Sequence, residues 1–364
     1  MRRIAGPVLV GLGVALLTLG IALRFYAYPQ LARVTAEYPL SKEARPAGQE
    51  PDAATTTSLG TGVQVFVTRT GQPIGPQTLD VESVRSTRGD VAAARGDAVY
   101  WETRVETFAP ALPGPEALST VVEGVCFDRT SGAASTGCDR RGYVQTERDA
   151  TRTLDRSGQY FKFPFATEQR SYPFWDGQVG EPVEARYAGT EEIDGLTVYK
   201  FVQTIADRSI GTREDVPGSL FGSRAPQVDA DIRYANVRTL WVEPETGVIV
   251  RGQEQQNRRM VAEGKEVALA VGTLAYGEKT VADTVLEQRD NARSLSLLRT
   301  VLPWTSGVLG ALLLVAGLAL VLLSTRRRRG RRAAGRPVPT PSSGTAVPRQ
   351  VDLTAGERQP QDHG

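Results

Sequence analysis

The sequence predicts a mainly β extracytoplasmic domain that lies between two transmembrane helices. Two uncharged apolar segments, one near each end, have about the 20 residues that a bilayer core requires. Between them, stretches of alternating hydrophobicity are separated by short turn motifs, and no βαβ alternation is visible. These observations predict a curved antiparallel meander sheet or half-barrel, followed by a helical stem that leads into the second span.

The first apolar segment covers residues 4–23 and follows two arginines. A cleaved signal peptide begins in the same way and is the alternative. The apolar run is longer than that of a usual signal peptide, and Arg24 occupies the place where small residues would mark a cleavage site. We therefore expect residues 1–25 to form an uncleaved N-terminal transmembrane helix.

The second apolar segment, residues 301–324, is predicted to be a transmembrane helix because an arginine-rich stop-transfer block follows it. We expect this block to set the membrane topology and to contact lipid headgroups, and we expect no nucleic-acid binding by so short a tail. The remaining residues are rich in Pro, Ser and Gly, so 325–364 is predicted to be a disordered, basic cytoplasmic tail. The arginines of the block are Arg326, Arg327, Arg328, Arg329, Arg331 and Arg332.

The net charge of +2 hides a strong asymmetry along the chain. Residues 326–364 contain nine Arg against three acidic residues, whereas residues 25–300 contain 31 basic and 38 acidic residues. Because the cytoplasmic flanks of membrane proteins collect Lys and Arg, this distribution predicts a two-span protein of the plasma membrane. Both termini are predicted to be cytoplasmic and the middle domain extracytoplasmic, with membrane lipids as partners.

Local patterns divide the middle of the chain. Residues Val99–Phe108 alternate between apolar and polar side chains, which is typical of a strand with one solvated face. Asp194-Gly195 and Glu263-Gly264 stand between such stretches, where two-residue hairpin turns are expected. A helical stripe of apolar residues follows Thr280. The predicted boundaries are a juxtamembrane stalk at 26–59, a β-rich domain at 60–279 and a helical stem at 280–300.

The composition excludes several kinds of site from the exported domain. The single histidine, His363, lies in the predicted tail, so histidine catalysis and histidine metal ligands are not expected there. Cys126 and Cys138 are too few for a four-thiolate zinc site or an iron–sulfur cluster. The turn-rich residues between them favour a disulfide worth about 3 kcal/mol, with two separate buried thiols as the alternative. No metal and no cofactor are predicted.

Two acidic clusters are candidates for carboxylate chemistry. They are Glu191-Glu192 with Asp194, and Asp229 with Asp231. Paired carboxylates serve glycosidases and bind calcium. The first cluster borders a turn and the second lacks EF-hand spacing, so we interpret both as solvated loop charge. No P-loop, nucleophile elbow or dinucleotide-binding pattern is present, and we expect no enzyme activity.

Residues 160–175 contain seven of the 25 aromatic side chains of the chain. Pro164 and Pro173 prevent a long helix and interrupt strand pairing. We interpret the segment first as a loop that only covers the core. The functional alternative is a wall of an apolar pocket or an exposed patch for a lipid or partner. Residues 196–205 form a strand that is apolar on both faces and needs cover on both. The candidate ligand-binding residues are Tyr160, Phe161, Phe163, Phe165, Tyr172, Phe174, Trp175, Tyr199 and Phe201.

Three blocks stand out in the middle domain: FPFATEQRSYPFWD, YAGTEEIDGLTVYKFVQ and RTLWVEPETGVIVRGQE. With a span on either side, they resemble the actinobacterial PorA-like family, formerly a domain of unknown function. The resemblance covers nearly the whole chain between the spans. It implies a porin by the family name, and some members are implicated in cell-envelope lipid trafficking and polar growth. A lipid-facing β-barrel, however, would need many alternating strands of about ten residues with aromatic girdles.

These observations predict a non-enzymatic envelope protein. Its extracytoplasmic β domain would bind a lipid or glycolipid, or dock an envelope transport partner, through an apolar concavity near the aromatic segment. The alternative is a porin-like channel formed by self-association of the helices. An ectoenzyme that uses carboxylates alone and a signalling receptor are further alternatives, although the tail offers no signalling domain.

Overall fold

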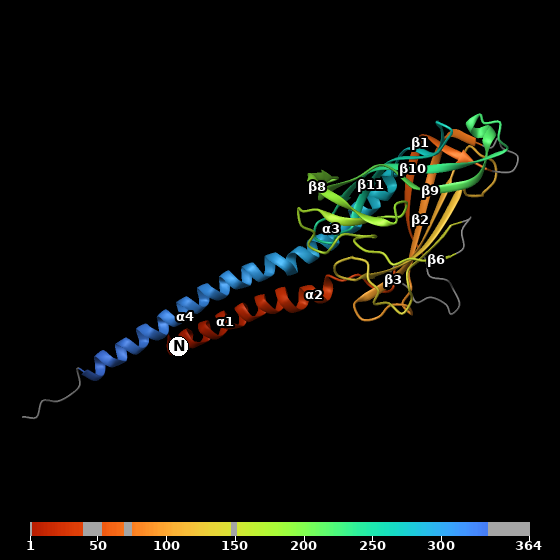
Figure 1. The fold of residues 1–364 in the computed structure, drawn as a ribbon. Coiled ribbons are helices and arrows are strands. Elements are labelled where there is room, and N and C mark those ends of the chain that lie inside the picture. The colour runs from red at the N-terminus through yellow and green to blue at the C-terminus, as the bar shows by residue number, and fades with distance from the viewer. Residues whose placement is uncertain (1, 39–52, 69–74, 147–150, 334–364) are drawn as a thin grey trace, which may run out of the picture. The chain divides into compact units, whose positions relative to one another are not determined.

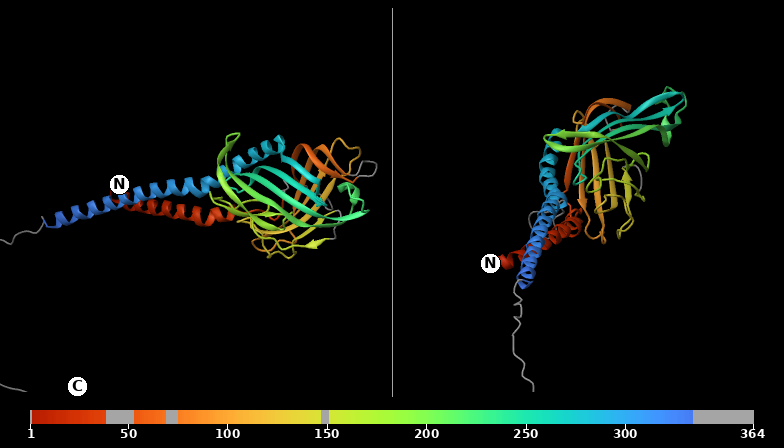
Figure 2. Two further views of the ribbon diagram at one scale, coloured as in Figure 1. Left: turned by 45° about the horizontal axis from the view of Figure 1, so that its top comes forward. Right: turned by 90° about the vertical axis from the view of Figure 1, so that its left-hand side faces the viewer.

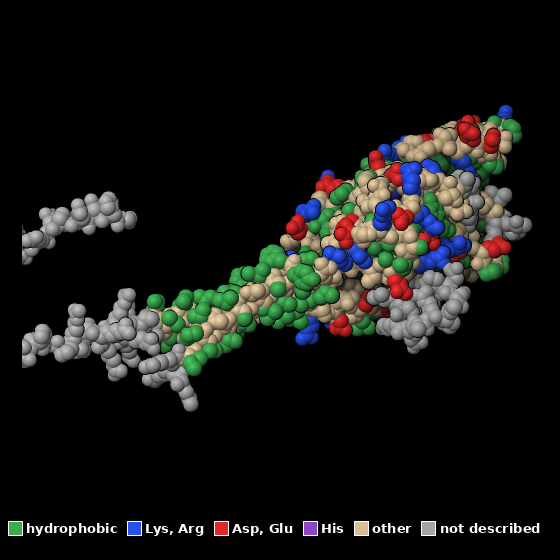
Figure 3. All heavy atoms as spheres, turned by 90° about the horizontal axis from the view of Figure 1, so that it is seen from below, with side chains coloured by type: hydrophobic (Ala, Val, Ile, Leu, Met, Phe, Trp, Pro, Cys, Tyr) green, Lys and Arg blue, Asp and Glu red, His purple; other side chains and the backbone are tan. Residues whose placement is uncertain are grey.

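The computed structural model describes residues 2–38, 53–68, 75–146 and 151–333 (Figure 1). The chain divides into two compact units. One unit is Ala15–Leu309, which contains the whole β domain, and the other combines Met1–Val14 with Gly310–Gly364. Figure 3 shows hydrophobic side chains along the helices and side chains of both charges spread over the β domain.

One antiparallel sheet dominates the described residues and contains twelve strands. The strands are β1 (Ala54–Val67), β2 (Gly75–Gly89), β3 (Ala98–Phe108), β4 (Ser119–Asp128), β5 (Tyr143–Thr146), β6 (Arg152–Thr153), β7 (Tyr172–Asp176), β8 (Glu181–Ile193), β9 (Leu196–Pro217), β10 (Gln227–Val242), β11 (Ile249–Ala262) and β12 (Lys265–Tyr276). The predicted mainly β class is therefore confirmed.

Helices flank the sheet in the chain. They are α1 (Arg2–Ala22), α2 (Tyr28–Leu31), α3 (Glu278–Ser296) and α4 (Leu302–Ala333), with a short 3-10 turn at Gly218–Phe221. Two π-helical turns, Leu23–Ala27 and Leu297–Val301, join α1 to α2 and α3 to α4. By length and composition, Ile4–Leu31 and Glu278–Leu323 are apolar enough to cross a membrane.

The sheet is an open meander with one long crossing. Its strand order is β6-β5-β4-β3-β2-β1-β12-β11-β10-β9-β8-β7, and every neighbouring pair is antiparallel. Strands β1 and β12 meet in the middle, whereas β6 and β7, consecutive in the chain, lie at opposite edges. Residues 154–171 must therefore cross the width of the sheet, which Figure 2 shows to be strongly curved. The predicted curved meander is confirmed, and the sheet does not close into a barrel.

Two hairpins lie where the sequence predicts them. Asp194 and Gly195 have φ values of 48° and 76°, and Glu263 and Gly264 have 49° and 70°. Two successive residues with positive φ define the turn that matches the twist of antiparallel strands. Strands β9 and β12 accordingly begin at Leu196 and Lys265.

The sheet begins earlier than the predicted boundary at residue 60. Strand β1 starts at Ala54, and its first residues pair with β2. The described part of the predicted stalk also contacts the domain, since the ring of Tyr38 stacks on Trp101 with 4.1 Å between centroids. The β-branched run Thr55–Thr57 explains the difference, because β-branched residues favour strands even where the hydrophobic pattern is weak. Residues 39–52 of the predicted stalk lie outside the described residues.

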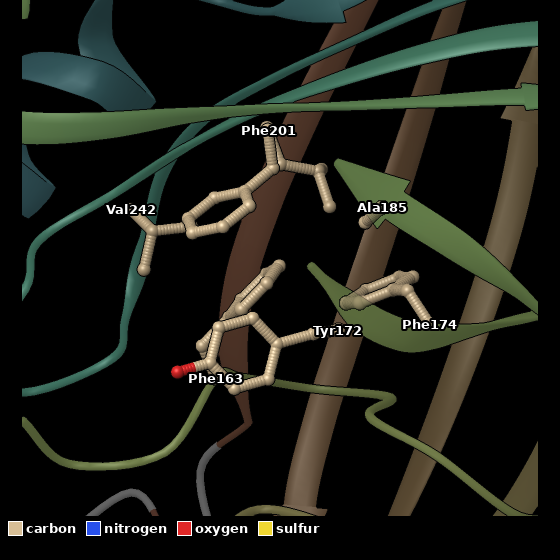
Figure 4. Close-up of a cluster of buried hydrophobic side chains, with 7 residues drawn as sticks. Phe163, Tyr172, Phe174, Ala185, Phe201 and Val242 are labelled. Carbon is tan, nitrogen blue, oxygen red and sulfur yellow. The ribbon is translucent and has the colours of Figure 1, made fainter. Parts of the chain in front are cut away.

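Strand β9 is covered on both faces, as its two apolar faces predict. On one face, Val198 packs with Trp241 of β10 and with Val285 of α3. On the other face, Phe201 stacks on Phe163 of the aromatic segment, with 4.5 Å between ring centroids (Figure 4). The aromatic segment and α3 thus hold this part of the sheet between them.

The second span extends beyond its predicted end. The helical backbone of α4 continues to Ala333 and includes the arginine block, whereas the sequence predicts disorder from residue 325. Arginine is a good helix former, and positive charge near a helix C-terminus complements the helix dipole. The side chains of the block and residues 334–364, predicted to be a disordered tail, lie outside what the structure describes.

The unit that holds both chain ends contains close contacts between α1 and α4. A Cβ atom at Gly13 would lie 2.7 Å from the carbonyl oxygen of Gly310, and one at Gly317 would lie 2.7 Å from the backbone nitrogen of Val10. Glycine is required at such positions because it allows two helix backbones to approach closely. The glycine-containing faces of α1 and α4 therefore pack against each other within one chain.

Candidate functional site

A cavity of about 800 Å³ lies between one face of the sheet and the segment that crosses it. One row of its lining follows the strand register from Thr56 to Arg85, Val105, Val121 and Thr146, on β1 to β5. Alternate residues of a strand share a face, so one face of the sheet supplies this wall. The facing wall comes from the crossing segment and the start of the next hairpin, and comprises Tyr160, Phe161, Phe174, Trp175 and Asp176.

Arg238 of β10 is the centre of a buried polar network on the sheet face. Its Nη2 lies 3.2 Å from Oδ2 of Asp176, which is fully buried, and its Nε lies 2.7 Å from Oε1 of Glu254. Its Nη1 donates to Oε1 of Gln203 at 2.6 Å. The hydroxyl of Tyr234 also donates to Asp176, at 3.2 Å. The guanidinium therefore contacts two carboxylates, and the network ties β7 to β10 and β11.

The pKa values of this network follow from its pairing. Burial acts to lower the pKa of Arg238, but Glu254 and Asp176 raise it above the usual value. Burial acts to raise the pKa of Glu254, but the Arg238 charge and hydrogen bond lower it. The pKa of Tyr234 is raised by burial and by Asp176. The charged forms of the pair are thus favoured, and the tyrosine stays neutral.

A second network joins the crossing segment to β4. Arg156 Nη2 lies 2.6 Å from Oε1 of Glu123, with side chains 2% and 11% exposed. The hydroxyl of Tyr160 donates a short hydrogen bond to the other oxygen of Glu123. Burial and Glu123 raise the pKa of Tyr160, so its hydroxyl remains a donor. Glu123 is thereby fully engaged by the crossing segment.

Arg85 of β2 lies beside these networks without a carboxylate partner. No carboxylate within the described residues forms an ion pair with it. Its nearest polar neighbours are Tyr160, Tyr276 and Glu123, which raise the pKa of Arg85 although burial opposes this. Trp175 is also unusual, because its side chain is 4% exposed and its Nε1–H has no acceptor among the described residues.

The rest of the lining is apolar. Val105, Val121 and Val144 on the sheet are continued by Leu154 and Phe161 on the crossing segment. Leu240, Ile249 and Leu274 line the part formed by β10, β11 and β12. The cavity is therefore amphipathic, with buried charged groups beside an aliphatic and aromatic wall. Such volumes and mixed linings are typical of sites for small organic ligands.

The candidate ligand-binding residues from the sequence divide between the cavity and the core. Tyr160, Phe161, Phe174 and Trp175 line the cavity. The core cluster contains Phe163, Tyr172 and Phe201, shares Phe174 with the cavity wall, and has Tyr199 packed against it. The remaining candidate, Phe165, lies with its ring centroid 3.3 Å from Nζ of Lys162.

Sequence reasoning missed the polar lining. Most of these residues alternate along their strands: Thr56 and Ser58, Ser83 and Arg85, and Glu254, Gln256 and Arg258, with Arg238 opposite Glu254. Polar residues at alternate positions normally indicate a solvated face. The crossing segment packs over that face and makes it the wall of a cavity. No local pattern in this segment indicates which strands it packs against.

The cysteines and the acidic clusters can also be placed. Cys126 and Cys138 form the predicted disulfide, with an S–S distance of 2.07 Å. Glu191 accepts from Lys200 at 2.8 Å and from Nε1 of Trp241 at 2.6 Å. Asp231 accepts from the hydroxyl of Ser209. Within the described residues, no group of three His, Cys, Asp or Glu side chains is placed to hold a metal ion.

The two π-helical turns connect to the aromatic segment through one ion pair. Nη1 of Arg299, in the second π-helical turn, lies 3.0 Å from each carboxylate oxygen of Glu245. Glu245 stands in the turn between β10 and β11, and its carbonyl oxygen accepts from the backbone N–H of Ala166 at 3.0 Å. Arg24 of the first π-helical turn donates to the carbonyl oxygen of Arg299 at 3.4 Å. Both turns and the crossing segment therefore share one chain of contacts.

Comparisons with known proteins identify the family. The family model described as Porin PorA matches residues 5–319. A Porin PorA from Corynebacterium resistens is 24% identical, over 92% of this chain and 99% of the relative. A Porin PorA from Corynebacterium amycolatum is 29% identical, over 45% of this chain and 54% of the relative. The match extends from the first apolar helix almost to the end of the second, and the chain therefore belongs to the Porin PorA family of membrane proteins.

Proposed function

We propose that this membrane protein uses its β domain to bind a lipid or glycolipid in the cavity. The observation that carries the proposal is the amphipathic cavity of about 800 Å³, in which buried charged networks stand beside an apolar wall. A ligand with a polar head and an apolar chain satisfies both parts of this lining. The activity is non-enzymatic, and an envelope transport partner would deliver or accept the ligand.

The proposed topology places both termini in the cytoplasm and the β domain outside it. It rests on the excess of arginine after the second span. A membrane–water interface near the domain-proximal ends of the two helices is supported by Phe25, Tyr26 and Trp304, which are 75%, 73% and 71% exposed. Aromatic residues at such positions favour the membrane–water interface. The cavity would then stand on the outer side of the membrane, where exported lipids arrive.

Native mass spectrometry of the full chain in amphipol tests the binding proposal. We expect lipid to co-purify with the wild type, and we expect Val105→Trp, which fills the cavity, to reduce the bound fraction about tenfold. Arg104→Trp is the matched control, because it changes an exposed side chain on the opposite face of the same strand. A wild-type protein that carries no lipid and binds none when it is added would contradict the proposal.

Channel formation is the second candidate, and the names of the relatives favour it over ligand binding. The open sheet provides no barrel, so a pore would need self-association of the two apolar helices. Purified full-length chain in a planar bilayer should then show stepwise conductance that disappears when residues 301–324 are replaced by an unrelated transmembrane helix. Conductance that persists after this replacement argues against a helix-built pore, and its absence from the wild type argues against a channel.

A further inference from the structure

We propose that Arg85 and the indole N–H of Trp175 form the head-group site of the cavity, and that this site takes an anionic oxyacid group, a phosphate or a carboxylate. The inference rests on the proposed binding function and names the chemistry of the ligand. It starts from a guanidinium that forms no ion pair and an indole N–H that has no acceptor within the described residues.

The two other buried arginines beside the cavity are each paired with at least one carboxylate. Arg238 is paired with Asp176 and Glu254, and Arg156 with Glu123. Arg85 has no carboxylate partner within the described residues. A guanidinium has five N–H donors in a planar fork that fits two oxygens of a carboxylate or phosphate.

Trp175 supplies an independent observation that points to an acceptor. Its side chain lines the cavity, is 96% buried, and has an Nε1–H without a partner in the part of the chain that the structure describes. An unmade hydrogen bond of a buried donor costs free energy, and a ligand oxygen in the cavity would remove this cost. The Arg85 guanidinium and this indole N–H are both donors, so the matching ligand group is rich in acceptors.

The strand register places an apolar path directly beside Arg85. Val105 of β3 is opposite Arg85, and Val121 of β4 is opposite Val105. The Cβ atoms of directly opposed residues on one face lie about 5 Å apart, so the apolar path begins at Val105, the residue next to Arg85 across the sheet. Phe161 and Leu154 line the same cavity from the crossing segment. A single-chain amphiphile whose head lies at Arg85 can therefore lay its chain along these valines.

Three twelve-carbon probes with different heads test the assignment: dodecyl phosphate, laurate and dodecyl maltoside. Each is titrated into the full chain in amphipol, with binding followed by calorimetry and by tryptophan fluorescence. We expect Arg85→Gln to weaken binding of the better anionic probe at least about tenfold and to change binding of the maltoside less than about twofold. Arg85→Lys should retain part of the anionic affinity. Which anionic probe loses more then distinguishes a phosphate from a carboxylate head.

Arg224→Gln is the control, because Arg224 is exposed and does not line the cavity. It should change binding of all three probes less than about twofold, and thermal unfolding should show that each variant is folded. If the maltoside binds the wild type as tightly as the anionic probes, or if Arg85→Gln leaves anionic binding unchanged, the head-group assignment is wrong while cavity binding stands. If no probe binds the wild type, the proposed binding function fails together with the assignment.

Discussion

Arg238 and Arg85 project from the same face of one sheet into one cavity, yet their surroundings differ. The Arg238 side chain is 13% exposed and pairs with two carboxylates, one of them fully buried. Arg85 forms no ion pair within the described residues, and its polar neighbours include the hydroxyls of Tyr160 and Tyr276. The carboxylates nearby, Glu123 and Glu254, are paired with Arg156 and Arg238. A buried arginine with its counter-charges present holds strands together, whereas one without them is available to a ligand. The following substitutions test this difference, from the largest expected effect to the smallest.

Replacing Arg238 should cost the most stability. Arg238→Leu leaves the fully buried Asp176 without its counter-charge, and breaking one side of a buried pair costs about 3–5 kcal/mol. Chemical unfolding of the full chain in amphipol measures the change. Arg233→Leu, which removes an exposed pair with Asp207, is the control and should cost less than about 1 kcal/mol. Equal losses for the two variants would show that the Arg238 network is not structural.

Replacing Glu123 should have a smaller but clear effect. Glu123→Gln leaves Arg156, whose side chain is 2% exposed, with a neutral acceptor in place of its carboxylate. Hydrogen bonds to charged groups contribute about 1.5–3 kcal/mol, and we expect a loss in this range. Because Tyr160 also donates to Glu123, proteolysis of the crossing segment should accelerate in parallel. A loss of stability without faster cleavage would show that the Glu123 network does not hold the crossing segment in place.

Acid should reduce the stability that the Arg238 network contributes, because Glu254 has a lowered pKa in the folded chain. The pKa of Glu254 is lowered from 4.5 in the folded chain, so the unfolded state takes up its proton first as the pH falls. This group therefore contributes stability above pH 4.5 and loses it as the pH falls through its lower folded pKa. Unfolding curves between about pH 3 and 7 should show this loss in the wild type. It should be smaller in Arg238→Leu, and a loss of equal size there would exclude the pair as its source.

Replacing Arg85 should leave stability nearly unchanged. Arg85→Leu removes a cation that forms no ion pair within the described residues and adds apolar lining, so we expect a change of less than about 1 kcal/mol. The same unfolding assay measures it. A loss of unfolding free energy as large as that of Arg238→Leu would show that Arg85, like Arg238, stabilises the fold.

The features that the sequence predicts are local. Asp194-Gly195 and Glu263-Gly264 specify their hairpins through two adjacent residues, and the two-sided apolar pattern of residues 196–205 predicts the double cover of β9. The aromatic segment is recognisable by composition, but its sequence does not say which rings enter the core and which face the cavity. Phe163 and Phe161 are only two residues apart, yet Phe163 lies in the core and Phe161 lines the cavity. The difference depends on packing against distant strands.

The polar half of the site depends on contacts that no local pattern contains. Arg238 and Glu254 meet through the register of one hairpin. Asp176 joins them from β7, which follows the crossing segment in the chain. Arg85 shares the cavity with Tyr276 only because β1 and β12 pair in the middle of the sheet. A single sequence carries no information on that pairing, so the charged lining could not be predicted from it.

The central pairing of β1 with β12 also has a kinetic consequence. Strands β1–β6 and β7–β12 are each a meander of near neighbours, whereas the ladder between them joins residues such as Leu59 and Ala275, which are far apart in the sequence. Closing a long loop is entropically costly, and contacts of high sequence separation slow folding. We expect the two halves to form first and their joining to be the slow step, so that the cavity comes into existence only in the last stage of folding.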